Sequence, residues 1–346
     1  MRLVKANDLD LTLFQFDFDL TFAVFFMNAD KTIYGRYGTR SSVENATKDI
    51  SLAGLAESMS AALRLLGQYP GNREQLIGKQ SVDTEFKSPS DFPSLQGKFK
   101  SALDYQGAVT QSCMHCHQVR DAERQVYRSA GKPIPDRLLF PNPSPTVVGL
   151  TLDPRQRATV TQIEKGSIAE ENGFRVGDDI VTLDGQAILS PADVQWVLHN
   201  AAPSDQLAAT VKRSKETLNL TLNLEPGWRH RSDISWRVTS WPLRRMGTGG
   251  LLFEEATSSQ RIEAGVDERG LALVVKHVGQ YGPHAAAKKA GFEQGDIVVS
   301  FDGRNQAMSP SQLLAYTAQH TKPGQQIPVV VSRGGKRMEL SLPMQD

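Results

Sequence analysis

Cysteine is scarce in this sequence, neither sign of charge is in excess, and a long apolar run is missing. Only two of the 346 residues are cysteines, which excludes a disulfide framework. Lys and Arg number 39 against 38 Asp and Glu, so nothing global favours nucleic acid or an anionic membrane as a partner. The most apolar run, Leu11 to Met27, is broken by Asp17 and Asp19. We therefore expect no nucleic-acid partner and no integral membrane segment.

The rest of the composition is that of a globular protein. Hydrophobic residues make up 39% and charged residues 22%, so the chain can bury cores, and its length allows two to four domains. The first residues lead into Asn and Asp without the apolar segment of a secretory signal. We expect either a cytoplasmic protein or an exported one whose leader is absent from this chain.

An internal repeat occupies the C-terminal two-thirds of the sequence. The run from Gly173 to Val181 recurs from Gly291 to Val299, and the Asp184-Gly185 pair recurs as Asp302-Gly303. In each copy a β-rich segment and a short helix lead to a glycine where a left-handed helix cap is needed. A strand, an Asp-Gly turn, a helix and a β-hairpin follow. The predicted N-caps of these later helices are Ser190 and Ser309, each followed by proline.

This pattern resembles PDZ domains, specifically the bacterial circular permutant found in Deg-type periplasmic proteases. The resemblance is carried by the run from Gly166 to Phe174, the Gly-Asp pairs and the Asp-Gly turns. It implies grooves that take an extended peptide or a protein C-terminus as an added strand. It also implies a carboxylate-binding loop before each groove strand. The corresponding residues are Val148, Gly149, Leu150 and Thr151 in the first copy, and Gly250 and Leu251 within Gly249 to Leu252 in the second.

The resemblance does not extend to proteolysis. The sequence has no Gly-x-Ser-x-Gly elbow and no serine-protease nucleophile segment.

Between the two copies, residues 227–262 carry three of the four tryptophans. Alternation of Ile234, Trp236 and Val238 predicts a half-buried strand there. We interpret these rings as packing between the modules rather than as a platform for a ligand.

The N-terminal region has a different pattern. Residues 20–27 and 32–37 predict a β-hairpin, and residues 52–66 predict a helix. The expected core face of this helix is Leu52, Leu55, Met59, Leu63 and Leu66. Together these elements resemble the last third of a thioredoxin-like domain. A Cys-x-x-Cys pair does not precede them, so the redox chemistry of that family is not carried over.

The sequence from Cys113 to His117 is the one reactive motif. Leu95 to Ala130 is helix-compatible, which would place Cys113, Cys116 and His117 on one face. The motif resembles the haem attachment signature of c-type cytochromes, which implies covalent haem c on both cysteines and His117 as axial iron ligand. Two alternatives stay open: a dithiol redox or other metal site with Cys113 as nucleophile, and a pair without function.

The sequence thus predicts an α+β, multidomain protein. We expect a thioredoxin-like segment (1–70), a helical region with the Cys-x-x-Cys-His motif (71–145), a first PDZ domain (146–226), a Trp-rich segment (227–262) and a second PDZ domain (263–346). The predicted function is a peptide-binding scaffold with a haem site, extracytoplasmic if haem is present. The alternatives are a thiol-disulfide oxidoreductase whose PDZ modules recruit substrates, and a plain adaptor. The redox partner is not predicted.

Overall fold

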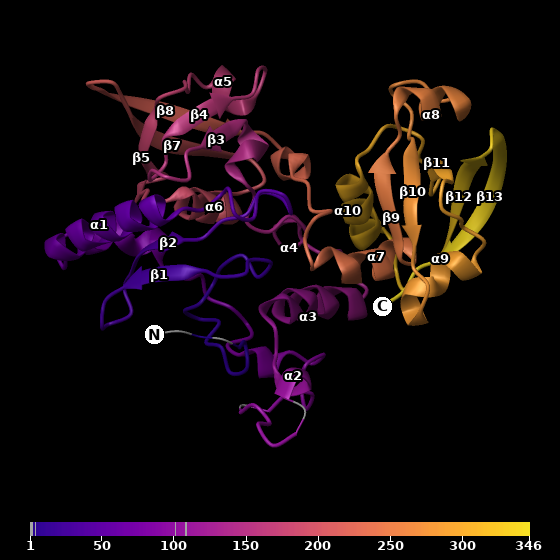
Figure 1. The fold of residues 1–346 in the computed structure, drawn as a ribbon, viewed down its shortest axis with the longest axis horizontal. Helices are drawn as coiled ribbons and strands as arrows, with labels where there is room; N and C mark the ends of the chain where they lie inside the picture. Colours follow the sequence, from indigo (N-terminus) through magenta and orange to yellow (C-terminus); the bar gives the residue numbers. More distant parts are fainter. Residues whose placement is uncertain (1–2, 4, 101, 108) are drawn as a thin grey trace. The chain divides into compact units, whose positions relative to one another are not determined.

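The structure of the chain is a computed structural model that describes residue 3 and residues 5–100, 102–107 and 109–346. The described residues form two compact units. The first contains the chain up to Asp91 together with Leu95–Cys116 and Phe140–Ser232, and the second contains Phe92–Ser94, His117–Leu139 and Asp233–Asp346. Each unit holds one copy of the repeat and mixes strands with helices, as expected for an α+β chain (Figure 1). Within these described ranges, no helix is both long and apolar enough to span a bilayer.

The N-terminal part of the first unit contains the predicted hairpin and helix. Strand β1 (Val24–Met27) pairs antiparallel with β2 (Ile33–Tyr37). Helix α1 (Leu52–Gln68) is capped by the Ser51 side chain, which accepts a hydrogen bond from the Gly54 amide. Its small residues Ala61 and Ala62 pack in one core cluster with Tyr34 of β2. The hairpin and helix are confirmed, whereas the likeness to a thioredoxin domain stays a prediction.

The expected core face of α1 is wrong. Leu52 is 86% exposed, Leu63 65%, Met59 49% and Leu66 43%. The buried face is instead the row of small residues Gly54, Ser58, Ala61 and Ala62. Small side chains let the helix backbone approach β2 closely, and this leaves the large apolar side chains on the outside.

The first repeat copy forms two sheets. Strands β3 and β4 make an antiparallel pair, and the other four strands follow the order β6-β5-β7-β8. Their apolar side chains and those of helix α6 form one core cluster. The elements are β3 (Leu150–Leu152), β4 (Val160–Ile163), α5 (Ile168–Glu171), β5 (Asp179–Leu183), β6 (Gln186–Ala187), α6 (Pro191–Asn200), β7 (Asp205–Arg213) and β8 (Glu216–Leu224).

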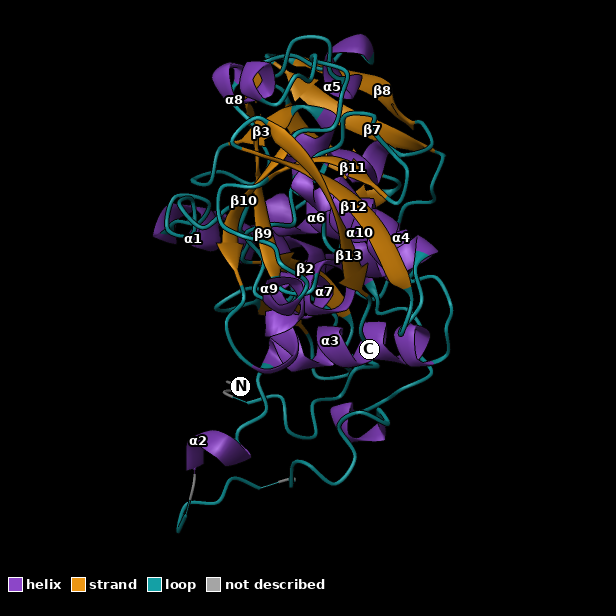
Figure 2. Ribbon diagram, turned by 90° about the vertical axis from the view of Figure 1, so that its right-hand side faces the viewer, coloured by secondary structure: helices purple, strands orange, loops and turns teal. Residues whose placement is uncertain are grey.

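The second copy forms one five-stranded antiparallel sheet in the order β13-β12-β11-β10-β9. Its longest pair, β12 with β13, is the predicted closing hairpin, and the two strands run side by side (Figure 2). The elements are β9 (Leu251–Glu255), α8 (Ser258–Glu263), β10 (Leu273–Val278), α9 (Ala286–Lys289), β11 (Ile297–Phe301), α10 (Pro310–His320), β12 (Gln326–Arg333) and β13 (Lys336–Pro343). Short 3₁₀-helices elsewhere span Arg73–Lys79, Pro89–Asp91, Pro145–Val148, Trp228–Arg231 and Gly282–Ala285.

The duplicated sequence landmarks make the same local structure in both copies. Gly173 and Gly291 have φ values of 82° and 93°, as left-handed helix caps require. The guanidinium of Arg213 donates two hydrogen bonds to the buried carboxylate of Asp178, with N···O distances of 2.7 and 2.9 Å, and we call this arrangement a fork. Asp296 and Arg333 repeat this fork at 2.6 and 2.8 Å. Each arginine also donates to the carbonyl of its cap glycine, so the fork ties the helix end to the hairpin.

A continuous helix from Leu95 to Ala130 is wrong. The chain there forms α2 (Val109–Ser112) and α3 (Cys116–Ser129), separated by a non-helical loop. The amide of Met114 donates to Asn7 Oδ1 and its carbonyl accepts from the Ala6 amide, so neither group is free for a helical bond. A further short helix, α4 (Asp136–Leu139), follows α3.

The strand predicted around Ile234 to Val238 is also wrong. This segment turns, because the Arg237 amide donates to the Ile234 carbonyl, and it leads into helix α7 (Ser240–Thr248). Trp228 lies in the core of the first unit, where its Nε1 donates to the Ala202 carbonyl. In the second unit Trp241 stays 45% exposed.

Candidate functional site

The groove strand of each repeat copy lies at the edge of its sheet. Strand β3 pairs on one side with β4, and β9 is the terminal strand of its five-stranded sheet. Among the described strands no other pairs with the second edge of either. Such an edge presents backbone N–H and C=O groups to which an extended peptide can be added as a further strand.

The predicted carboxylate-binding residues lie at the end of the loop before β3 and in the first two residues of that strand. Val148 and Gly149 are buried, Leu150 is 2% exposed, and the Thr151 side chain faces solvent. Gly149 has φ +89°, and an added Cβ would overlap the Ser167 hydroxyl, so only glycine fits here. Its amide donates to the Thr146 carbonyl at 2.9 Å. A peptide carboxylate could bind this amide only by replacing that carbonyl.

The loop before β9 is built in a similar way. Gly249 and Gly250 both have positive φ, and both amides donate to the Arg244 carbonyl at the end of α7. A Cβ on Gly250 would overlap the His284 carbonyl. Leu251, the first residue of β9, is buried. The structure therefore gives both loops the same glycine geometry, with the glycine amides already bonded to the preceding helical turn.

Helix α6 of the first repeat copy is held by residues that sequence reasoning missed. The Asp193 carboxylate lies 3.0 Å from Lys79 Nζ and accepts the Arg36 backbone amide at 3.1 Å. Both side chains of the ion pair are buried. Burial lowers the pKa of Lys79, and the Asp193 charge opposes that shift. An isolated Asp in the first turn of a predicted helix carries no signal of this partner, which lies more than a hundred positions away.

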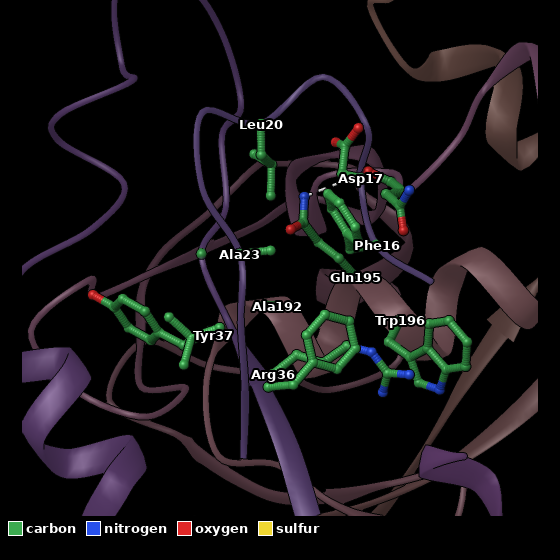
Figure 3. A pocket seen from close by; sticks show the side chains of 13 residues that line it. Phe16, Asp17, Leu20, Ala23, Arg36, Tyr37, Ala192, Gln195 and Trp196 are labelled. Carbon is green, nitrogen blue, oxygen red and sulfur yellow. Dashed lines mark hydrogen bonds between the residues drawn. The ribbon is translucent and has the colours of Figure 1, made fainter. Parts of the chain in front are cut away.

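The next turn of α6 completes this contact. Trp196 Nε1 donates to the Gly78 carbonyl at 2.8 Å, and the Arg36 guanidinium lies 3.6 Å from the centre of the Trp196 ring. Burial lowers the pKa of Arg36 to about 10. Figure 3 shows Arg36 beside Trp196 in the wall of a pocket that Gln195 and Phe16 also line. The N-terminal segment thus fixes the position of α6.

The reactive motif lies where the two units meet along the chain, with Cys113 and Cys116 in the first and His117 in the second. Asn7 anchors the loop that carries Cys113: its Nδ2 donates to the Ser112 and Lys100 carbonyls. Both cysteines are free and partly exposed. Burial raises the pKa of the Cys116 thiol, and the neighbouring Cys113 raises it further.

His117 lies in the first turn of α3. Its Nδ1 lies 3.9 Å from Asp121 Oδ2, one turn further along α3. Two thiols and an imidazole are the donors that c-type haem requires, so the set of residues fits this group. Among the described residues, no cluster of three or more His, Cys, Asp and Glu side chains suits a bare metal ion.

Comparison with known proteins identifies the repeat. Residues 141–224 and 253–344, together just over half of the chain, match the family model described as PDZ domain. The chain belongs to the PDZ domain family. Both PDZ copies contain the glycine caps, arginine forks and edge strands described above, and this confirms the tandem PDZ domains expected from the sequence.

Two curated relatives are DegP-like, as expected from the Deg-type resemblance. The probable periplasmic serine endoprotease DegP-like of Halomonas elongata is 26% identical over 167 residues, covering 47% of this chain and 32% of that protein. Its counterpart from Ectopseudomonas mendocina is 28% identical over 187 residues, covering 54% and 37%. The chain spans about a third of the length of these relatives. The solved HtrA-type protease AlgW with decapeptide aligns with a TM-score of 0.26 at 17% identity, covering 40% of this chain and 48% of that one.

Proposed function

We propose that both PDZ domains bind an extended peptide or a protein C-terminus by strand addition. The observation that carries this proposal is the position of β3 and β9 at sheet edges, each directly after a loop with a left-handed glycine. Main-chain hydrogen bonds to the added strand supply the affinity. The peptide carboxylate takes the Gly149 amide in the first domain and the Gly250 amide in the second, where it replaces the carbonyl of the preceding turn.

Amide hydrogen exchange tests strand addition directly. The probe is a synthetic decapeptide with an apolar last residue and a free carboxylate, and the control is the same peptide ending in a carboxamide. Saturating peptide should slow exchange at residues 150–152 and 251–255, because a new strand pairs with their free edges. The carboxamide should bind about tenfold more weakly, because it lacks the charge that the loop amides receive. Unchanged exchange in both strands would refute the proposal.

We further propose that Cys113 and Cys116 hold haem c, with His117 as an axial ligand. Support comes from the donor set, which is two free and partly exposed thiols with an imidazole directly after the second. Bound haem would supply one-electron transfer. Since haem is attached to proteins of this type outside the cytoplasm, and both relatives are named periplasmic, the proposed location is extracytoplasmic.

A spectrum of denatured protein tests the haem. The chain is expressed with an export leader together with a cytochrome c maturation system. A Soret band that survives denaturation shows covalent haem, and it should disappear in the Cys113→Ser/Cys116→Ser variant. A colourless protein would exclude this proposal.

Two free, partly exposed thiols three positions apart favour one other candidate, a dithiol that reacts with a disulfide substrate. The Cys113 thiolate would attack the substrate disulfide and release one substrate thiolate. Cys116, after losing its proton, would attack the Cys113 sulfur and release the second. The product is a Cys113–Cys116 disulfide and a reduced substrate. Thiol counting before and after treatment with oxidised glutathione distinguishes this candidate, which predicts the loss of two titratable thiols.

A further inference from the structure

Helix α1 presents an apolar face that nothing in the described chain covers. Leu52, Met59, Leu63 and Leu66 are 43% to 86% exposed, and half-buried Leu55 lies in the same row. Four large side chains exposed to this degree form a patch on the order of a few hundred Å², a size that marks interaction surfaces on soluble proteins. The face is independent of the peptide grooves and of the reactive motif.

The charge of this face does not favour an anionic partner. The charged residues of α1 are Glu57 and Arg64, one of each sign, and at 100° per residue both lie off the apolar row. Membrane-surface helices carry several Lys or Arg residues beside their apolar face, and α1 does not. Exposed small residues border the row instead, at Ala56, Ser60 and Gly67. They leave room for another helix to approach closely.

The spacing of the row is symmetric about its middle. Moving out from Met59 in either direction, the next apolar residues stand four and then seven positions away, at Leu55 and Leu52 on one side and at Leu63 and Leu66 on the other. An isologous two-fold contact needs a surface that is complementary to itself. In an antiparallel pair centred on Met59, Leu52 meets Leu66 of the partner subunit and Leu55 meets Leu63 of the partner subunit.

We propose that α1 is a self-association surface and that two copies of this chain pair through antiparallel α1 helices. Stable specific interfaces bury about 800 Å² on each partner. A single helix face from Leu52 to Leu66, about 21 Å long at 1.5 Å per residue, supplies about half of that. The dimer is therefore weak and forms only at high protein concentration.

Disulfide trapping tests the pairing and its direction. In a Cys113→Ser/Cys116→Ser background, Met59→Cys should cross-link to its own copy, because both sulfurs lie at the two-fold axis. Leu52→Cys alone should not, because the two Cα atoms stand about 21 Å apart along the helices. A mixture of the Leu52→Cys and Leu66→Cys variants should cross-link. Efficient cross-linking of Leu52→Cys alone would show a parallel pair and overturn the proposed geometry.

A charge placed on or beside the row gives a second, matched test. Leu63→Glu should abolish the dimer seen by sedimentation velocity at 100 μM protein, because the carboxylate would be buried in the contact. Arg64→Glu, one residue further along and off the row, should leave the dimer intact. Circular dichroism checks that both variants fold. A wild-type chain that stays monomeric at this concentration, including one that binds neutral phosphatidylcholine vesicles instead, would overturn the proposal.

Discussion

The two PDZ domains share their internal landmarks and differ in what holds α6 in the first and α10 in the second. Both have the glycine cap and the Asp–Arg fork, at Asp178–Arg213 and Asp296–Arg333. Around α6 the first domain uses a buried ion pair, Lys79 with Asp193. Around α10 the second uses close backbone packing, since a Cβ on Gly247 of α7 would overlap Thr317. The features within the repeat are thus common to both copies, whereas each supporting segment is particular to one.

Asp193→Asn should have the largest effect in this comparison. It leaves the buried Lys79 ammonium without its counter-charge, and breaking a buried pair in this way destabilises a protein by about 3 to 5 kcal/mol. Gln312 stands at the matching position of α10, and Gln312→Ala removes only a side chain of its capping box, so it should cost about 1 kcal/mol. Urea unfolding followed by circular dichroism measures both. Equal losses would mean that the ion pair does not distinguish the domains.

The stability loss caused by Asp193→Asn should depend on pH. Burial lowers the pKa of Lys79 in the folded chain, and Asp193→Asn removes the charge that opposes this shift. Between the folded and the unfolded pKa of Lys79 the unfolded chain binds more protons, so the free energy of unfolding rises with pH in that window. The deficit of Asp193→Asn relative to wild type should therefore shrink between pH 7 and pH 10. A deficit that grows over this range would contradict the assignment.

Gly247→Ala tests the support of the second domain. The added methyl group would overlap Thr317, and overpacking of this kind costs about 1 to 3 kcal/mol. Gly67→Ala in α1 is the matched control, because nothing lies within 4 Å of its Cβ position. That change should stabilise the chain by about 0.5 to 1 kcal/mol. A stabilising Gly247→Ala would show that α7 does not pack against α10 as described.

Removal of the N-cap side chains of α6 and α10 should give the smallest difference in stability loss between the two domains. Ser309 accepts the Gln312 amide, so Ser309→Ala should cost about 1 kcal/mol. Ser190 accepts the Ala192 amide and also donates to the Arg36 carbonyl, a buried bond that adds about 1 kcal/mol to the cost of Ser190→Ala. Thermal unfolding of both variants measures this gap. No gap would indicate that the Arg36 contact contributes little.

What the sequence predicted well is local. Left-handed glycines, Ser-Pro helix starts and Asp-Gly turns each act over a few residues, so the order of elements in both repeats could be read from the chain. The predictions were wrong where contacts with residues distant in the sequence determine the local structure. Asn7 withdraws Met114 from a helix. The small residues of α1, rather than its leucines, are buried, with Gly54 against the Pro154 carbonyl and the Ser58 hydroxyl donating to the Leu189 carbonyl. Neither the periodicity nor the composition of the sequence indicates which distant residues will make these contacts.

The candidate site also contains residues that the sequence could predict and residues that it could not. The loop glycines at 149 and 250 were identified from the resemblance to PDZ domains, and in the structure both have a left-handed backbone. Arg213 and Arg333 stood at matching places in the repeat, and their pairing with Asp178 and Asp296 could have been predicted because both members recur together. Lys79 and Arg36 lie outside the repeat, so no internal comparison could reveal their contact with Asp193.

The contact of Arg36 and Lys79 with α6 also determines where the first domain can be cut. A fragment trimmed to residues 141–224, the family boundaries, would carry Asp193 and Trp196 without the neighbours that now cover them. In that fragment the Trp196 ring and the Asp193 carboxylate of α6 would be exposed to water, because Arg36 and Lys79 would be absent. We therefore expect a fragment that includes Arg36 and Lys79 to be more stable than one trimmed to residues 141–224.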